Sequence, residues 1–283
     1  MNKVKIAIIG LSGQSIFMNI DEFHKEGETK QAKKVFIEPG GKGYNQAIAC
    51  SRFGADVYYL SSVGSDEYAK VCEDYMKKEG INTFFISKKE NTAIATIITN
   101  DKGDNQVTVY KGANDLLTLD DLEIFKETIK ACDILLLQNE IPYDVLKEAI
   151  NFAKSQNVYV ILNPAPAVYD LNEVLDLVDL LIPNETEAYQ IYNKKIEDLN
   201  VKNTIITLGS KGCVYINGNN KKYYDSIKVN VVDTTGAGDV FCAGIAVKIK
   251  NSSIDEAINF ATKVASLHIQ KPHVLDAIPY IKK

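Results

Sequence analysis

Short apolar segments that alternate with amphipathic stretches constrain the fold of this chain more than any other feature. The segments are rich in β-branched residues, are apolar on both faces, and mostly end in Gly, Pro or Asn. Stretches of helical period, such as 142–157, lie between several of them. Such strands, alternating with helices, predict a mostly parallel sheet with helices on both faces, a three-layer α/β/α fold. The expected strands are 5–10, 57–64, 133–138, 158–164, 178–184 and 203–209.

Two insertions depart from this pattern. About residues 12–40 contain strand-like pieces around a turn at Glu26 and Gly27, and about residues 91–112 contain a β-hairpin signal around the turn NDKGDN. Antiparallel insertions in a parallel α/β chain predict a small separate sheet, which covers a cleft as a lid or forms an oligomer contact. We expect residues 1–283 to make one main domain that carries this lid as an appendage.

Composition excludes several classes of protein. Hydrophobic residues make up 46% of the chain and charged residues 24%, which is typical of a globular protein with a sizeable core. The net charge is −5, Arg52 is the only arginine, and the lysines form no basic stripe, so we expect no nucleic-acid partner. No segment approaches the ~18 consecutive apolar residues of a membrane span.

Cysteine usage and the first residues point to a reducing compartment. The five cysteines are widely separated and never spaced as CxxC, which is typical of buried free thiols. The apolar part of the N-terminal KVKIAIIG is too short for a secretory signal. We therefore expect a cytoplasmic protein with no membrane partner.

Polar or glycine-rich loops follow the expected strands. The carboxyl ends of parallel strands meet at one edge of a sheet, where ligands collect in open α/β folds, so these loops predict a common site. They are NPAPA (163–167), PNETEA (183–188), TLGSKG (207–212) and DTTGAGD (233–239), and PGGKGYNQA (39–47) opens a helix after the first insertion.

The loop DTTGAGD predicts an anion site. Gly236, Ala237 and Gly238 gather backbone N–H groups at the start of a helix expected from Asp239 to Lys250. Asp239 either caps or complements the helix dipole, or deprotonates a substrate hydroxyl while the amides stabilise a transferring phosphoryl group. The dipole should lower the pKa of Asp239, and phosphoryl transfer tolerates such a weak base. This loop alone leaves both interpretations open.

Taken together, the five loops resemble segments of the ribokinase-like (PfkB) carbohydrate kinases, in the same order and spacing. PGGKGYNQA and DTTGAGD resemble the two signature motifs of that family, the similarity spans nearly the whole chain, and the pattern is closest to ribokinases. The resemblance implies an α/β kinase with a β-sheet lid that uses ATP and Mg²⁺ to phosphorylate a primary hydroxyl of a small sugar. It also implies a homodimer formed through the lid.

The resemblance further implies roles for individual residues. Asp239 is the expected catalytic base, and Gly236, Ala237 and Gly238 are the expected anion hole. The sugar is expected at Gly41, Lys42, Asn45, Glu140 and Ser15, and ATP at Asn184, Glu187, Thr207 and Gly209, with Glu187 holding Mg²⁺ through water.

One departure from the family pattern concerns the substrate. Ribokinases usually carry Asn and Asp in the loop after the first strand, where this chain has Gly13 and Ser15. A serine makes a weaker, neutral contact with sugar hydroxyls than a carboxylate does, so ribose is not fixed as the acceptor. One alternative is a nucleoside kinase of the same fold, with Phe17, Met18 or Phe36 of the lid covering a base. Another is a non-catalytic protein that binds ATP or a sugar.

A second departure concerns a monovalent cation. His273 and Ala277 stand where the family often has Gly and Ser near such a site, whereas Asp233 and the carbonyl of Thr235 still offer oxygen ligands. A K⁺ site is therefore an open expectation. The spacing of the three histidines does not suit zinc, and we expect a structural role for each: His24, His268 and His273.

Overall fold

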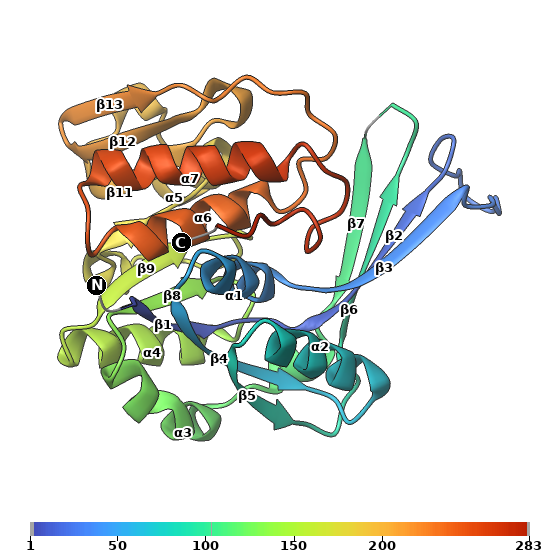
Figure 1. The fold of residues 1–283 in the computed structure, drawn as a ribbon, viewed down its shortest axis with the longest axis horizontal. Helices are drawn as coiled ribbons and strands as arrows, with labels where there is room; N and C mark the ends of the chain where they lie inside the picture. Colours follow the sequence, from blue (N-terminus) through green and yellow to red (C-terminus); the bar gives the residue numbers. More distant parts are fainter. Residues whose placement is uncertain (1–2, 103, 282–283) are drawn as a thin grey trace.

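A mostly parallel sheet forms the middle layer of the molecule (Figure 1). The computed structural model describes residues 3–102 and 104–281, and over these residues the sheet has nine strands in the order β13-β12-β11-β10-β9-β8-β1-β4-β5. The strands from β11 to β5 pair in parallel, and β12 and β13 extend one edge antiparallel. The strands are β1 (Lys5–Ile9), β4 (Asp56–Val63), β5 (Asn82–Ser87), β8 (Ile134–Gln138), β9 (Tyr159–Asn163), β10 (Leu180–Leu181), β11 (Val201–Thr207), β12 (Cys213–Gly218) and β13 (Asn220–Tyr224).

Helices cover both faces of this sheet, as the apolar strands predict. Successive side chains of a strand point to opposite faces, and in β1 Ile6 and Ile8 join one core cluster while Ala7 and Ile9 join another. The first cluster packs under four helices, α1 (Lys42–Arg52), α2 (Glu67–Lys78), α6 (Ala237–Lys248) and α7 (Ile254–His268). The second cluster packs under α3 (Leu119–Lys130) and α4 (Tyr143–Ser155). The helix α5 (Glu185–Tyr192) covers β11 and β12. The short 3₁₀ helices are η1 (Gly112–Leu116), η2 (Leu175–Leu177), η3 (Ile196–Asp198) and η4 (Gly209–Lys211).

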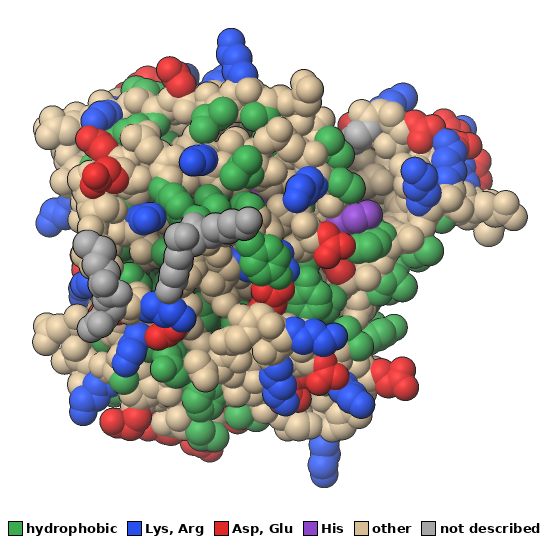
Figure 2. Space-filling view, in the orientation of Figure 1, with side chains coloured by type: hydrophobic (Ala, Val, Ile, Leu, Met, Phe, Trp, Pro, Cys, Tyr) green, Lys and Arg blue, Asp and Glu red, His purple; other side chains and the backbone are tan. Residues whose placement is uncertain are grey.

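The two insertions form a second sheet, the lid, which projects from the body (Figure 1). Its order is β3-β2-β6-β7, with β2 and β6 parallel and the outer pairs antiparallel. The strands are β2 (Gly13–Asn19), β3 (Lys34–Gly40), β6 (Ala93–Thr99) and β7 (Asn105–Tyr110). Gly103 of the predicted turn NDKGDN lies outside the described residues. On the face drawn in Figure 2, acidic and basic side chains are interspersed, and hydrophobic side chains lie exposed on the lid.

Two expected elements have different bounds in the structure. The strand expected at 178–184 is reduced to Leu180–Leu181, because η2 ends just before it and Pro183 follows it. The helix expected from Asp239 begins at Ala237 and ends at Lys248. That the chain makes one main domain stays a prediction. None of the helices in the described ranges has the length and apolarity needed to cross a membrane.

Two buried side chains hold the C-terminal segment against the body. Arg52 donates from Nη1 to the carbonyl oxygens of Leu275 and Ile278, the latter at 2.9 Å. Glu38, at the base of the lid, accepts hydrogen bonds from the backbone N–H groups of Val274 and Leu275 at 2.9 and 3.0 Å. Burial raises the pKa of Glu38 to about 7. This segment therefore connects the lid with the region beside the start of α6.

Candidate active site

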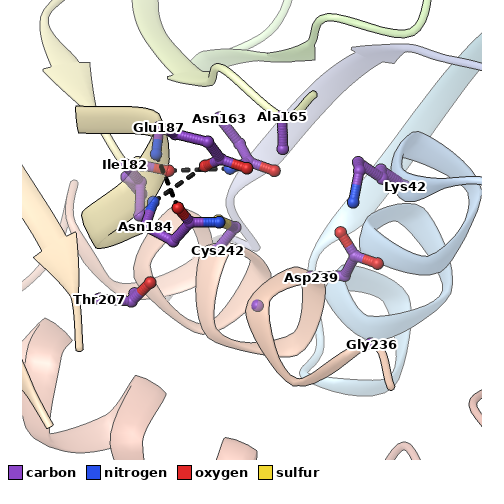
Figure 3. A pocket seen from close by; sticks show the side chains of 11 residues that line it. Lys42, Asn163, Ala165, Ile182, Asn184, Glu187, Thr207, Gly236, Asp239 and Cys242 are labelled. Carbon is purple, nitrogen blue, oxygen red and sulfur yellow. Dashed lines mark hydrogen bonds between the residues drawn. The ribbon is translucent and has the colours of Figure 1, made fainter. Parts of the chain in front are cut away.

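A pocket lies where β9, β10 and β11 end and α6 begins (Figure 3). Loops that are far apart in the sequence meet there, as the parallel sheet predicts. In Figure 3, Lys42 and Asp239 lie at one side of the pocket, and Asn184 and Glu187 lie at the other. The expected site residues that line the pocket are Lys42, Asn184, Glu187, Thr207, Gly236, Gly238 and Asp239.

The start of α6 fits an anion. Gly236 is the N-cap residue, with φ +79°, and no side chain caps the helix. A Cβ added at Gly238 would meet no described atom within 4 Å, so the first turn faces open space. Unpaired amides at a helix N-terminus bind anions through their N–H groups and the helix dipole. Asp239 does not cap the helix, because no side chain does, but as the acidic residue of the first turn it still complements the helix dipole.

The carboxylate of Asp239 is instead held by two amides of α1. Oδ2 accepts a hydrogen bond from Asn45 Nδ2 at 2.9 Å, and Oδ1 accepts one from Gln46 Nε2 at 3.1 Å. Asp239 is 6% exposed, and this burial raises its pKa, although Lys42, Asn45 and Gln46 act in the opposite direction. The lowered pKa expected from the dipole was wrong because desolvation outweighs it. Asp239 is therefore a stronger base than its place on the helix suggested.

Lys42 brings a positive charge to this carboxylate. Its amine points toward Asp239 in Figure 3. Burial favours the neutral amine, yet the carboxylates of Asp239, Glu140 and Glu187 raise the pKa of Lys42, so the amine is charged. The backbone N–H of Lys42 also donates to Glu140 Oε2 at 2.7 Å, which links α1 to the loop after β8. Burial raises the pKa of Glu140 to about 7.

Asn184 and Glu187 form a capping box at the start of α5. Asn184 Oδ1 accepts from the backbone N–H of Glu187 at 2.8 Å, and Glu187 Oε2 accepts from that of Asn184 at 2.9 Å. Burial raises the pKa of Glu187. Among the described residues, no group of three His, Cys, Asp or Glu side chains could enclose a metal. The carboxylate of Glu187 is the kind of oxygen ligand that Mg²⁺ accepts, since this ion usually keeps several waters and binds through one or two carboxylates and the substrate phosphates.

Thr207 and Gly209 continue the same side of the pocket. The backbone N–H of Thr207 donates to the carbonyl of Pro183 at 3.0 Å, which ties the end of β11 to the start of α5. Gly209 starts η4 with φ +59°, and a Cβ there would meet nothing within 4 Å. The surface directly beside Gly209 is therefore open.

Other expected sugar-binding residues lie around Lys42. Gly41 precedes α1 with φ +121°, and a Cβ there would come within 2.2 Å of the Leu11 carbonyl oxygen. Asn45 is 9% exposed, and its Oδ1 has no hydrogen-bond partner among the described residues. Ser15 lies on β2, with its Oγ against Gly40 of the neighbouring strand, and does not line the pocket.

The oxygens expected to bind a monovalent cation already accept hydrogen bonds within the chain. Asp233 accepts hydrogen bonds from the backbone N–H groups of Thr235 at 2.9 Å and His273 at 3.3 Å. The carbonyl oxygen of Thr235 lies 2.7 Å from Nε2 of His268. Each of these oxygens therefore already faces an N–H donor.

Two polar residues of the site escaped sequence-based prediction. Gln46 donates from Nε2 to Asp239 Oδ1 and, at 3.2 Å, to Asn163 Oδ1, and its Oε1 accepts from Gln138 Nε2 at 2.6 Å. Asn163 lines the pocket and donates to the Ile182 carbonyl at 2.8 Å. The available signals were the place of Gln46 next to Asn45 and the place of Asn163 at a strand end.

The comparisons with known proteins agree with this geometry. Residues 4–280 match the family model described as pfkB family carbohydrate kinase. The ribokinase of Staphylococcus aureus (strain COL) is 33% identical, over 99% of this chain and 98% of its own length. The deoxyribokinase of Salmonella typhi is 30% identical, over 98% of this chain and 96% of its own.

A solved structure extends the likeness to three dimensions. The structure of Arabidopsis thaliana ribokinase complexed with ribose and ATP superimposes with a TM-score of 0.86 at 30% identity, and the match covers 99% of this chain and 96% of that one. The fold is therefore ribokinase-like. With the family model matched over residues 4–280, the chain belongs to the pfkB family of carbohydrate kinases.

Proposed function

We propose that this kinase transfers the γ-phosphoryl group of ATP to a primary hydroxyl of a small sugar, with Asp239 as the base. The observation that carries the proposal is the buried Asp239 carboxylate on the first turn of α6, beside the backbone amides of Gly236 and Gly238 at the pocket. The amide of Ala237, also expected in the anion hole, instead donates to the Thr234 carbonyl at 3.1 Å. A base and an oxyanion-type site on the same helical turn can act on the two ends of one forming O–P bond.

The nucleotide would lie along Thr207 and Gly209, with its terminal phosphate at Gly236 and Gly238. Asp239 would take the proton of the acceptor hydroxyl while the amides of α6 stabilise the charge on the phosphoryl oxygens. Glu187 and Asn184 would hold Mg²⁺ through water, and Mg²⁺ when bound neutralises phosphate charge. The Arabidopsis relative, which is a complex with ribose and ATP, supports ATP as the donor.

The acceptor would lie between the lid and α1. Asn45 Oδ1, buried without a partner among the described residues, is suited to accept a hydrogen bond from a sugar hydroxyl. The charged amine of Lys42 is a donor on the same side, and Glu140 an acceptor. Closure of the lid would exclude water and so limit hydrolysis of ATP.

Ribose, 2-deoxyribose and related pentoses are the acceptors that the relatives favour, because both a ribokinase and a deoxyribokinase are about equally similar to this chain. The nucleoside alternative receives less support. One aromatic ring proposed to cover a base, Phe36, is stacked on His273 with ring centroids 3.5 Å apart.

The partner proposed for the lid is a second copy of this chain. Val35 and Ile37 on β3, 62% and 55% exposed, share one face of the lid sheet, and Val107 and Val109 on β7, 54% and 49% exposed, lie on the other face. Apolar side chains concentrated on a projecting sheet favour burial in an interface. A cytoplasmic location stays a prediction.

The test of the function is ADP release by the purified protein with Mg-ATP and a panel of pentoses, hexoses, polyols and nucleosides. Saturable release with a pentose, and a phosphate monoester on its primary hydroxyl by ³¹P NMR, is the expected result. Preference for a nucleoside would favour the second kinase function. ATP binding without turnover on any acceptor would support the non-catalytic alternative and contradict the proposal.

A further inference from the structure

His268 lies directly behind the start of α6. It is the last residue of α7, its side chain is fully buried, and its Nε2 lies 2.7 Å from the carbonyl oxygen of Thr235. A carbonyl oxygen only accepts hydrogen bonds, so Nε2 carries the proton and donates. This is the carbonyl that a monovalent cation was expected to use.

The imidazole also lies at hydrogen-bond distance from the oxygen that such a cation would contact. A cation ligated by Thr235 must contact the carbonyl oxygen, where the Nε2–H group already lies. The second expected ligand, Asp233, has both carboxylate oxygens turned toward backbone N–H groups. The N–H groups around these oxygens therefore provide the partial positive charge that a bound cation would otherwise supply.

The contact fixes the peptide group at the entrance to the anion site. In a planar trans peptide the C=O of Thr235 and the N–H of Gly236 point in opposite directions. Holding the carbonyl on His268 therefore sets the direction of the Gly236 N–H, at the N-cap of α6 and at the edge of the pocket. The packing is tight: a Cβ on Gly236 would lie 2.7 Å from Val274 Cγ1 and 3.4 Å from His268 Nε2.

We propose that the side chain of His268 takes the place of a monovalent cation, holding the Thr235 carbonyl so that the amides at the start of α6 are oriented without potassium. The inference rests on the proposed phosphoryl transfer. It assigns His268 as a positioning residue, because it does not line the pocket and acts through the Thr235–Gly236 peptide.

The first experiment compares salts on the unmodified protein. Acceptor-dependent ADP release and the thermal unfolding midpoint are measured in KCl, NaCl and choline chloride at equal ionic strength. We expect rates that agree within about twofold and midpoints that coincide, because the donor is built into the chain and its effect on the anion site does not need an added ion.

The second experiment varies the side chain. His268→Ala opens space beside Thr235 and should lower kcat about tenfold in choline chloride, since small displacements of an anion site are costly. KCl should restore most of this loss and raise the unfolding midpoint of that variant alone. His268→Gln keeps an N–H donor and should stay active in either salt, while His268→Leu keeps the volume without the donor and should stay slow in both. His24→Ala, at an exposed lid position, is the control.

Several results would overturn the inference. The first is activation of the unmodified protein by KCl of tenfold or more. The second is a His268→Ala variant that is as fast as the unmodified protein in choline chloride. The third is a His268→Ala variant whose lowered rate KCl does not restore. If His268→Ala fails to fold, the salt comparison on the unmodified protein decides. If no acceptor is phosphorylated, the proposed function fails separately, and a rise of the unfolding midpoint in KCl would still contradict the inference.

Discussion

At the scale of single residues, the site depends on a carboxylate that is buried yet paired. Asp239 loses solvation, which raises its pKa, and regains stabilisation from Lys42 and from the amides of Asn45 and Gln46. The hydrogen bonds hold the carboxylate in one orientation, and the loss of solvation keeps its pKa high enough for it to accept a proton. The family resemblance proposed Asp239, Lys42 and Asn45 as site residues, but not Gln46. Its role arises from a contact 193 residues away, which no local pattern records.

Gln46→Ala removes one of the two hydrogen bonds that orient Asp239. We expect kcat to fall about tenfold with little change in KM for the acceptor, because the base is misaligned while the sugar contacts remain. Steady-state kinetics with the preferred acceptor measure this, with the half-buried Gln156→Ala at the end of α4, away from the pocket, as control. An unchanged kcat would show that Asn45 alone positions the carboxylate.

Lys42→Met removes the positive charge that stabilises ionised Asp239. The pKa of Asp239, already raised by burial, should then rise further. Because the base must be ionised to accept a proton, the acidic limb of the kcat profile should move to higher pH. The profile is measured at saturating ATP and acceptor, with the exposed Lys130→Met as control. A limb that stays in place or moves to lower pH would refute this role of Lys42.

At the scale of elements, the anion site depends on the backbone conformation of the residues at which α6 begins. The sequence pattern located this start within two residues of the observed one, because the apolar run from Val240 marks the helix and the glycines mark the loop. It could not show that Gly238 would lie inside the helix. Likewise it overestimated β10, whose length is limited by the adjoining 3₁₀ turn and Pro183.

Gly238→Ala should separate stability from activity. A Cβ there meets nothing within 4 Å, so the helix should gain about 0.5–1 kcal/mol. The methyl group would occupy phosphate space, and kcat should fall at least about tenfold. Urea unfolding and kinetics measure the two effects. Gly244→Ala in the same helix is the contrast, because its Cβ would lie 2.7 Å from Ala261 Cα and should destabilise the protein.

At the scale of the whole molecule, the body and the lid followed from different signals. Strands apolar on both faces were enough to predict the parallel sheet and its helical layers, and alternating polarity was enough to predict the lid hairpins. The hydrogen bonds between Glu38 and the C-terminal segment were not predictable, because they join residues more than 230 positions apart. The contact of His268 with Thr235, 33 positions away, also escaped prediction, because no local pattern records it.

The proposed dimer can be tested at the exposed apolar residues of β3. Replacing Val35 and Ile37 together with Asp should convert a dimer into a monomer, since unpaired charges in an apolar interface are costly. Sedimentation velocity at micromolar concentration measures the change. Val71→Asp, at a 45% exposed position on α2, should leave the association unaltered. A monomeric unmodified protein, or a double variant that still dimerises, would contradict an interface at β3.

The most direct measurement for the whole account is acceptor-dependent ADP release by the Asp239→Asn variant beside the unmodified protein, with ATP affinity measured by calorimetry in both. Asparagine keeps the size of the side chain but cannot accept the hydroxyl proton. The account predicts a kcat lower by about a thousandfold, with ATP binding retained. A variant that keeps most of its turnover would contradict Asp239 as the base, and with it the proposed mechanism.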